Sequence, residues 1–69
     1  MTSRFARFNR KYAPTGFVFV DAARVRGIEP AEAALGNTAI HIDADGAMLT
    51  IYVNESPLEV YTAVSAISP

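Results

Sequence analysis

The segment Ser56-Pro57-Leu58-Glu59 marks the start of a helix, and it constrains the fold more than any other feature of the sequence. Ser56 suits the N-cap, Pro57 suits the first helical position, where no N–H is needed, and Glu59 completes a capping box with Ser56. We expect the helix to end at about Ser68. Three helical turns are not stable alone, so this helix must pack against a sheet. The apolar stripe for that packing is Val60, Val64 and Ile67, flanked by Leu58 and Tyr61.

A β-hairpin is predicted over residues 38–53, directly before the helix. Asp45-Gly46 is favoured in a type I′ turn because both central residues need a positive φ. Centring the turn on this pair places Ala44 opposite Ala47, Ile42 opposite Leu49, and Ile40 opposite Ile51. These side chains share one face, and the register is specified because a slip of one residue would mix the two faces. The other face carries His41, Thr50 and Tyr52.

Two further strands precede the hairpin, and a short third strand is compatible with residues 4–9. Phe17-Val-Phe-Val20 is the clearest strand, because aromatic and β-branched residues suit a pleated surface. The next strand is expected over residues 24–28, after a short turn at 21–23. Tyr12-Ala-Pro-Thr-Gly16 has the composition of a turn, since proline fixes φ and glycine permits a positive φ.

These elements predict an α+β fold, in which a three- to four-stranded antiparallel sheet carries one C-terminal helix on one face. Residues 1–69 form a single small domain, with residues 1–16 as a basic N-terminal arm or strand followed by a turn. Residues 30–37 leave two alternatives open, namely one helical turn closed by Gly36 or Asn37, or a loop between strands. The inward residues are expected to include Val18, Val20, Val25, Ile28, Ile40, Ile42, Leu49, Ile51, Val53, Val60, Val64 and Ile67.

The composition excludes several classes of protein. The 69 residues include no cysteine, so a thiol nucleophile and a thiolate zinc site are excluded, and a reducing compartment such as the cytoplasm is expected. The longest wholly apolar run, Phe17–Val20, is too short to cross a bilayer, and the basic N-terminus lacks the apolar stretch of a signal peptide. So small a core is marginally stable, and oligomerisation would help to stabilise it.

The charges are distributed unevenly, although the formal net charge is only −1. All six basic residues lie in the first 26 positions, whereas six of the seven acidic residues lie from Glu29 onward. Either the two halves neutralise each other when they pack, or the basic segment is a binding surface. The segment Arg4–Lys11 interleaves cations with aromatic rings, which suits nucleic acid. The candidate residues for an anionic partner are Arg4, Arg7, Arg10, Lys11, Arg24 and Arg26.

No cluster of residues in the sequence indicates a reaction, and we predict that the protein is not an enzyme. His41 is the only histidine, and the sequence shows neither a nucleophile nor an orienting acid for it. A pH-sensitive contact at an oligomer interface is an alternative role. Asp43-Ala-Asp45-Gly46 resembles the start of a calcium loop, but Asn54 stands where such a loop needs its glutamate. We therefore expect no catalytic residue, no cofactor and no metal.

The order of these signals resembles that of the small flagellar FlbD-type proteins, and small prophage proteins share it. The resemblance covers about 50 of the 69 residues. It implies the fold and the role of a bacterial or prophage accessory protein, and it assigns no functional residue. The segments that carry it are Phe17–Val20, Ala23–Glu29, Thr38–Asp43, Gly46, Leu49–Val53, Asn54-Glu-Ser56 and Leu58-Glu-Val60, together with Ala6-Arg-Phe-Asn9, which is similar to the family's opening Thr-Arg-Leu-Asn.

Two classes of function follow from these patterns. The first is a non-catalytic protein-interaction or accessory module, homo-oligomeric through an apolar sheet face that one helix cannot cover. The alternative is a protein that binds nucleic acid or an acidic partner through the basic arm. The expected partners are a second copy or another protein, with nucleic acid as the alternative and no membrane. The expected oligomer interface comprises Phe17, Phe19, Met48 and Tyr52.

Overall fold

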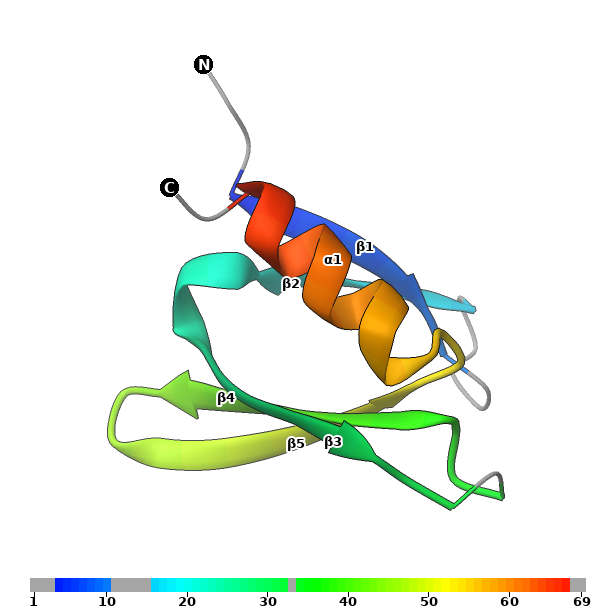
Figure 1. The fold of residues 1–69 in the computed structure, drawn as a ribbon. Coiled ribbons are helices and arrows are strands. Elements are labelled where there is room, and N and C mark those ends of the chain that lie inside the picture. Colours follow the sequence, from blue (N-terminus) through cyan, green and yellow to red (C-terminus); the bar gives the residue numbers. More distant parts are fainter. Residues whose placement is uncertain (1–3, 11–15, 33, 68–69) are drawn as a thin grey trace.

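The computed structural model describes residues 4–10, 16–32 and 34–67, and these form an α+β fold, as the sequence predicts (Figure 1). The helical elements are a short 3₁₀-helix, η1 (Ala22–Arg24), and the C-terminal helix α1 (Pro57–Ile67). Residues 12–15 of the predicted turn and the predicted helix end at Ser68 lie outside the described residues. The strands are β1 (Phe5–Asn9), β2 (Phe17–Asp21), β3 (Val25–Pro30), β4 (Thr38–Ala44) and β5 (Ala47–Val53).

The strands divide into two antiparallel sheets, whereas the sequence predicts one sheet of three to four strands. β1 pairs with β2, and a separate sheet has the strand order β3-β4-β5. The division occurs at η1, where Asp21 Oδ1 accepts a hydrogen bond from the Ala23 N–H at 3.0 Å. This bond holds a tight turn that redirects the chain, so β3 begins a second sheet instead of continuing the first.

The β1–β2 hairpin has one buried face and one exposed face. Ala6 and Phe8 of β1 and Val20 of β2 are buried, and Val18 packs against them. This confirms the predicted inward face of β2. It also adds Ala6 and Phe8, which the sequence did not place in the core. The exposed positions of the hairpin are Phe5, Arg7, Asn9, Phe17 and Phe19.

The β4–β5 hairpin confirms the predicted register. Ala44 pairs with Ala47, and the pairing continues along both strands to Thr38 opposite Val53. Asp45 and Gly46 have φ values of 54° and 92°, as a type I′ turn requires. The Gly46 N–H also donates to Asp43 Oδ1 at 3.2 Å, which further stabilises the turn.

β3 begins one residue later and ends two residues later than expected. η1 occupies the region of the predicted turn, and the register of β3 against β4 shifts between Val25 and Gly27, as in a β-bulge. In the following segment, the Leu35 and Gly36 N–H groups both donate to the Glu32 carbonyl, at 2.9 and 3.2 Å. The segment therefore forms one helical turn, and Gly36 closes it with a φ of 138°.

The start of α1 confirms the predicted capping box. The Glu59 N–H donates to Ser56 Oγ at 3.2 Å, and the Ser56 N–H donates to Glu59 Oε1 at 3.1 Å. The hydrogen bond from the Ser56 backbone, aided by the Ser56 side chain, lowers the pKa of Glu59 because it stabilises the carboxylate form.

The linker between β5 and α1 attaches to the end of β1. The Glu55 carboxylate accepts the Asn9 N–H at 3.0 and 3.1 Å, and Asn9 Nδ2 at 2.9 Å. The Asn54 N–H donates to the Asn9 carbonyl at 2.8 Å. Thr38 Oγ1, which is fully buried, donates to the Glu55 carbonyl at 2.6 Å. These bonds connect the two sheets across the linker.

Both sheets and α1 contribute to a single core (Figure 1). Of the residues predicted to face inward, only Leu49 lies outside this cluster, because 53% of its surface is exposed. Leu49 lies on the predicted face, but close to the β4–β5 turn, which projects away from α1. The hydrophobic residues with the lowest exposure are Phe8, Val20, Ile40, Val53 and Val60.

Candidate functional site

The four residues of the predicted oligomer interface are exposed, but they do not form one patch. Phe17 and Phe19 lie on the outer face of β1–β2, whereas Met48 and Tyr52 lie on the outer face of the three-stranded sheet. Because both sheets direct their buried residues into the same core, their outer faces point away from each other. The expectation of a single apolar face is therefore replaced by two separate surfaces.

The outer face of the three-stranded sheet is centred on His41. Its Nε2 lies 2.8 Å from Glu29 Oε1, and its Nδ1 lies 3.0 Å from Thr50 Oγ1. A carboxylate only accepts hydrogen bonds, so Nε2–H donates to Glu29, and in the neutral ring Nδ1 accepts the Thr50 hydroxyl. The predicted hairpin register already places Thr50 beside His41. Sequence reasoning missed Glu29, because it reaches His41 only through the pairing of β3 with β4.

Gly27 makes room for the His41 ring. A Cβ atom at Gly27 would lie 3.2 Å from His41 Cδ2, which is closer than most such contacts. Beside the ring is a hollow of about 350 Å³, between the outer face of the sheet and the turn that follows β3. Leu35 and Tyr52 supply apolar walls to this hollow. With both ring nitrogens hydrogen-bonded, the imidazole is held in a fixed orientation on the sheet surface.

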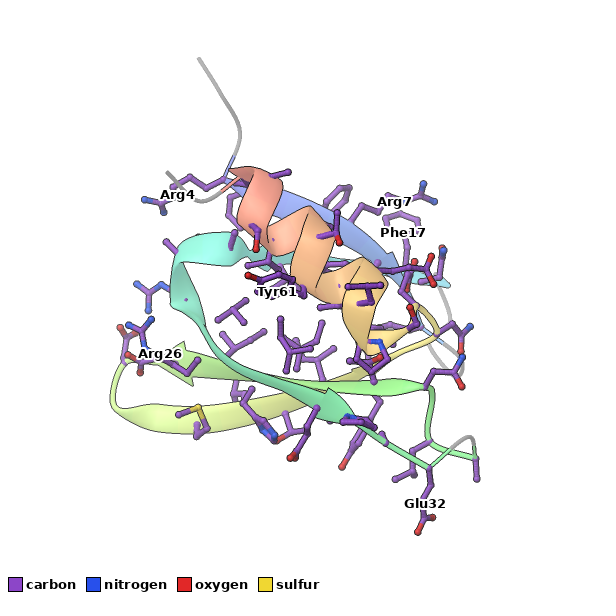
Figure 2. All side chains as sticks on the ribbon, viewed as in Figure 1. Arg4, Arg7, Phe17, Arg26, Glu32 and Tyr61 are labelled. Carbon is purple, nitrogen blue, oxygen red and sulfur yellow. The ribbon has the colours of Figure 1, made fainter. Side chains whose placement is uncertain are left out.

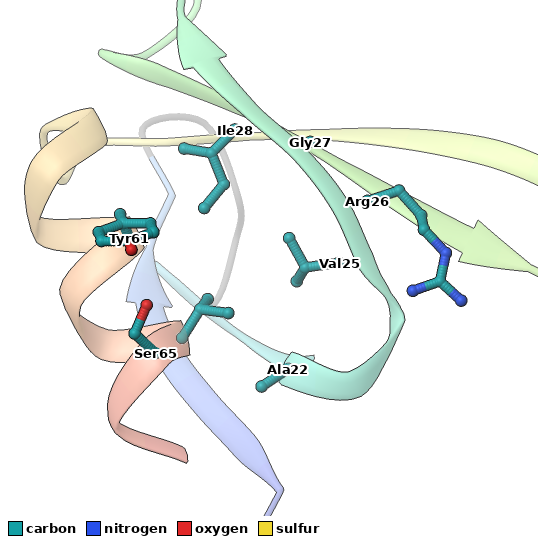
Figure 3. A pocket seen from close by; sticks show the side chains of 8 residues that line it. Ala22, Val25, Arg26, Gly27, Ile28, Tyr61 and Ser65 are labelled. Carbon is teal, nitrogen blue, oxygen red and sulfur yellow. The ribbon is translucent and has the colours of Figure 1, made fainter. Parts of the chain in front are cut away.

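A second hollow, of about 410 Å³, lies between β3 and α1. Figure 3 shows Val25 and Ile28 directed from β3 towards Tyr61 and Ser65 of α1. Arg26 also lines this hollow, and Figure 3 shows its guanidinium directed away from α1.

β5 is an edge strand, and its sequence contains no charged residue, glycine or proline. The two-residue turn makes Ala44–Ala47 a hydrogen-bonded pair, and such pairs alternate along an antiparallel ladder. The N–H and C=O groups of Met48, Thr50 and Tyr52 therefore point away from β4. We call these backbone groups the open edge of β5.

Two of the other strand edges are protected. β3 has the charged residues Arg26 and Glu29, a bulge, and Pro30, which has no N–H to donate. β1 is bonded at Asn9 to the linker, and α1 packs along it. Charges, bulges, proline and covering elements are the usual means by which edge strands avoid pairing with other chains.

The predicted basic residues that the structure describes separate into two groups, and Figure 2 labels Arg4, Arg7 and Arg26 among them. Arg4 and Arg24 form ion pairs with Asp21, at 3.0 and 3.8 Å, and Arg26 lies 3.7 Å from Asp43. Arg24 also reaches Asp45 at 3.5 Å. Part of the basic charge is therefore neutralised by carboxylates, including two from the acidic half of the chain.

Two of the remaining basic residues, Arg7 and Arg10, lie in the described part of the β1–β2 hairpin. The Arg7 guanidinium lies 4.7 Å from the centre of the Phe17 ring, in a cation–π contact, and Arg10 is exposed at the end of β1. Lys11 lies outside the described residues. The structure thus brings Arg7 to the aromatic residues of the hairpin and leaves Arg24 and Arg26 elsewhere.

Over residues 4–10, 16–32 and 34–67, no group of three or more His, Cys, Asp or Glu residues is arranged to hold a metal ion. None of the helices in this part of the chain is long and apolar enough to cross a membrane. Comparisons of the chain with protein-family models, with curated proteins and with solved structures give no match. The resemblance to FlbD-type and prophage proteins therefore remains a prediction.

Proposed function

We propose that this protein is a non-catalytic interaction module that associates with a second copy of itself through the open edge of β5. The observation that carries the proposal is an uncharged seven-residue edge strand with Met48, Leu49 and Tyr52 exposed. Such an edge is a template for another strand, and natural proteins rarely leave one unprotected. We also propose a reducing compartment such as the cytoplasm, because the chain has no cysteine.

Two copies of β5 are complementary in an antiparallel arrangement centred on Thr50. This register places Thr50 of each copy opposite Thr50 of the other, and Met48 opposite Tyr52. The outward backbone groups then form about six hydrogen bonds. Met48 gains a sulfur–aromatic contact with Tyr52, which is favourable at such distances. The product is one continuous sheet with a two-fold axis, and two-fold dimers are the commonest oligomers.

The same register explains the exposed Leu49. On the inner side of the sheet, Leu49 of one copy lies opposite Ile51 of the other, so pairing covers apolar surface that the monomer leaves in contact with water. β2 is also an edge strand, but it is shorter and ends at Asp21, which is engaged in ion pairs. These differences favour β5 as the interface.

Sedimentation velocity over a range of protein concentrations tests the proposal. The wild-type protein is expected to form a dimer, and Thr50→Lys is expected to be monomeric because two lysines would lie directly opposite each other. Thr50→Val is the matched control, since it also removes the hydroxyl that bonds His41 but keeps a β-branched, uncharged strand. A monomeric wild-type protein at high micromolar concentration, or a dimer that survives Thr50→Lys, would contradict the proposal.

A further inference from the structure

The outer face of the β1–β2 hairpin has an unusual combination of exposed rings and cations. We define the aromatic face as Phe5, Arg7, Phe17 and Phe19. Phe5 is 51% exposed and Phe19 is 59% exposed, although each ring is large and apolar. Neither residue belongs to the proposed β5 interface, because the hairpin forms a separate sheet.

The strand register brings these side chains together. Arg7 pairs with Phe19, and Phe5 is two residues before Arg7 in β1, so it lies on the same face and diagonal to Phe19. The Phe17 and Phe19 rings are 5.6 Å apart and nearly perpendicular, in an edge-to-face contact. Arg7 lies over Phe17 at 4.7 Å, as Figure 2 shows for these two residues. The result is a strip of rings with a guanidinium beside it.

The charge around the aromatic face is positive. Arg7 lies on the face, Arg10 follows the end of β1, and Arg4 is paired with Asp21. The Glu55 carboxylate from the linker is bonded to Asn9 at one end of the face, where it offsets one of these charges. Asp21 is the one acidic residue among the described positions of the hairpin, and its side chain is only 11% exposed and is paired with Arg4 and Arg24. By contrast, the outer face of the other sheet carries Glu29 and Asp43. The hairpin is therefore complementary to a negatively charged partner.

We infer that the aromatic face binds single-stranded nucleic acid. Unpaired bases stack on exposed aromatic rings, and arginine contributes both phosphate contacts and stacking. Phe5 and Phe19 offer the rings, Arg7 offers a cation beside them, and Arg10 adds a positive charge after the end of β1. An acidic protein segment would use the cations but would gain little from the rings. A second copy of the hairpin would bring like charges together, which disfavours self-association at this face.

Fluorescence anisotropy with labelled oligothymidylate and oligouridylate of about 10 nucleotides, at about 50 mM salt, tests this inference. Phe19→Ala is expected to weaken binding about 5- to 100-fold, because one stacked base is lost. Arg7→Gln is expected to weaken binding and to lower the slope of log K against log salt by about 1. Because Phe19 and Arg7 are exposed, both variants should retain the circular dichroism spectrum of the wild type.

Two matched variants and one different polyanion complete the experiment. Tyr61→Ala removes an exposed ring from α1, and Arg26→Gln removes an arginine from β3, so neither should change the affinity by more than about twofold. Absence of binding at about 50 mM salt would overturn the inference. Unchanged affinity in Phe19→Ala would overturn it as well. Equally tight binding of polyglutamate would instead indicate an acidic protein partner.

Discussion

At the scale of single residues, the capping box of α1 is a pair of short-range hydrogen bonds that the sequence predicts from spacing alone. Ser56 and Glu59 each donate a backbone N–H to the other's side chain. Sequence reasoning succeeds here because every participating atom lies within one helical turn. The same locality explains why Asp45-Gly46 predicts the β-turn, since the requirement for positive φ values is local to those two residues.

The capping box makes the stability of the protein dependent on pH. The pKa of Glu59 is lower in the folded protein than its ordinary value of 4.5, because hydrogen bonds from Ser56 stabilise the carboxylate. The stability that the Glu59 carboxylate contributes is therefore fully present above pH 4.5, and it is lost as the pH falls through the lower pKa of the folded protein. Glu59→Gln keeps the hydrogen-bonding geometry but does not titrate.

Urea denaturation of both proteins at several pH values measures this effect. The difference in unfolding free energy between wild type and Glu59→Gln is expected to be constant above pH 4.5. As the pH falls below this value, the wild type should lose stability relative to Glu59→Gln. A difference that is the same at all pH values would show that Glu59 does not contribute through its charge.

Gly36 is a second position where the backbone conformation favours glycine. A close contact with β5 strengthens this preference. The φ of Gly36 is 138°, and an added Cβ would lie 2.9 Å from the Val53 carbonyl oxygen. We expect Gly36→Ala to lower the unfolding free energy by about 1–3 kcal/mol. Gly46→Asn is the comparison and should cost less, because a Cβ at Gly46 meets no atom within 4 Å and asparagine adopts a positive φ more readily than alanine. Equal stability of Gly36→Ala and wild type in thermal unfolding would refute this account.

At the scale of secondary-structure elements, the linker between β5 and α1 attaches to β1 through Glu55. The sequence offers no signal for this contact, because Asn9 and Glu55 are 46 residues apart. We expect Glu55→Ala to lower the unfolding free energy by about 1–2 kcal/mol, since it leaves the Asn9 N–H without its carboxylate partner.

Urea denaturation with a matched acidic variant checks the role of Glu55. Glu32→Ala removes an exposed carboxylate from the turn after β3, and it should change the unfolding free energy by less than about 0.5 kcal/mol. A loss as large in Glu32→Ala as in Glu55→Ala would mean that general charge effects, rather than the bonds to Asn9, explain the result.

Strand pairing is also what surrounds His41 with partners. The predicted hairpin already places Thr50 beside one ring nitrogen, and the pairing of β3 brings Glu29 to the other, which the sequence does not indicate. Pairing likewise separates the four apolar residues expected to share one interface, because β2 and β5 belong to different sheets.

At the scale of the whole molecule, two small sheets and one helix share a core but leave the open edge of β5 uncovered. If a second copy covers it, folding and association are linked, so the midpoint of thermal unfolding should rise with protein concentration. Thr50→Lys should remove that dependence, whereas Thr50→Val should retain it. Differential scanning calorimetry at several concentrations decides this, and an unchanging wild-type midpoint would argue against association.

The sequence by itself determines the local elements of this protein: the turn at Asp45-Gly46, the register of β4 against β5, the cap of α1 and the alternation that puts Val18 and Val20 on one face of β2. Each depends on residues that are close together in the chain, or on the alternation of side chains between the two faces of a strand. Only the tertiary structure decides that η1 divides the strands between two sheets, that Leu49 lies beyond the cover of the core, and which strand edges are protected. These features depend on contacts between distant segments, because burial and pairing are properties of the packed chain and not of its local pattern.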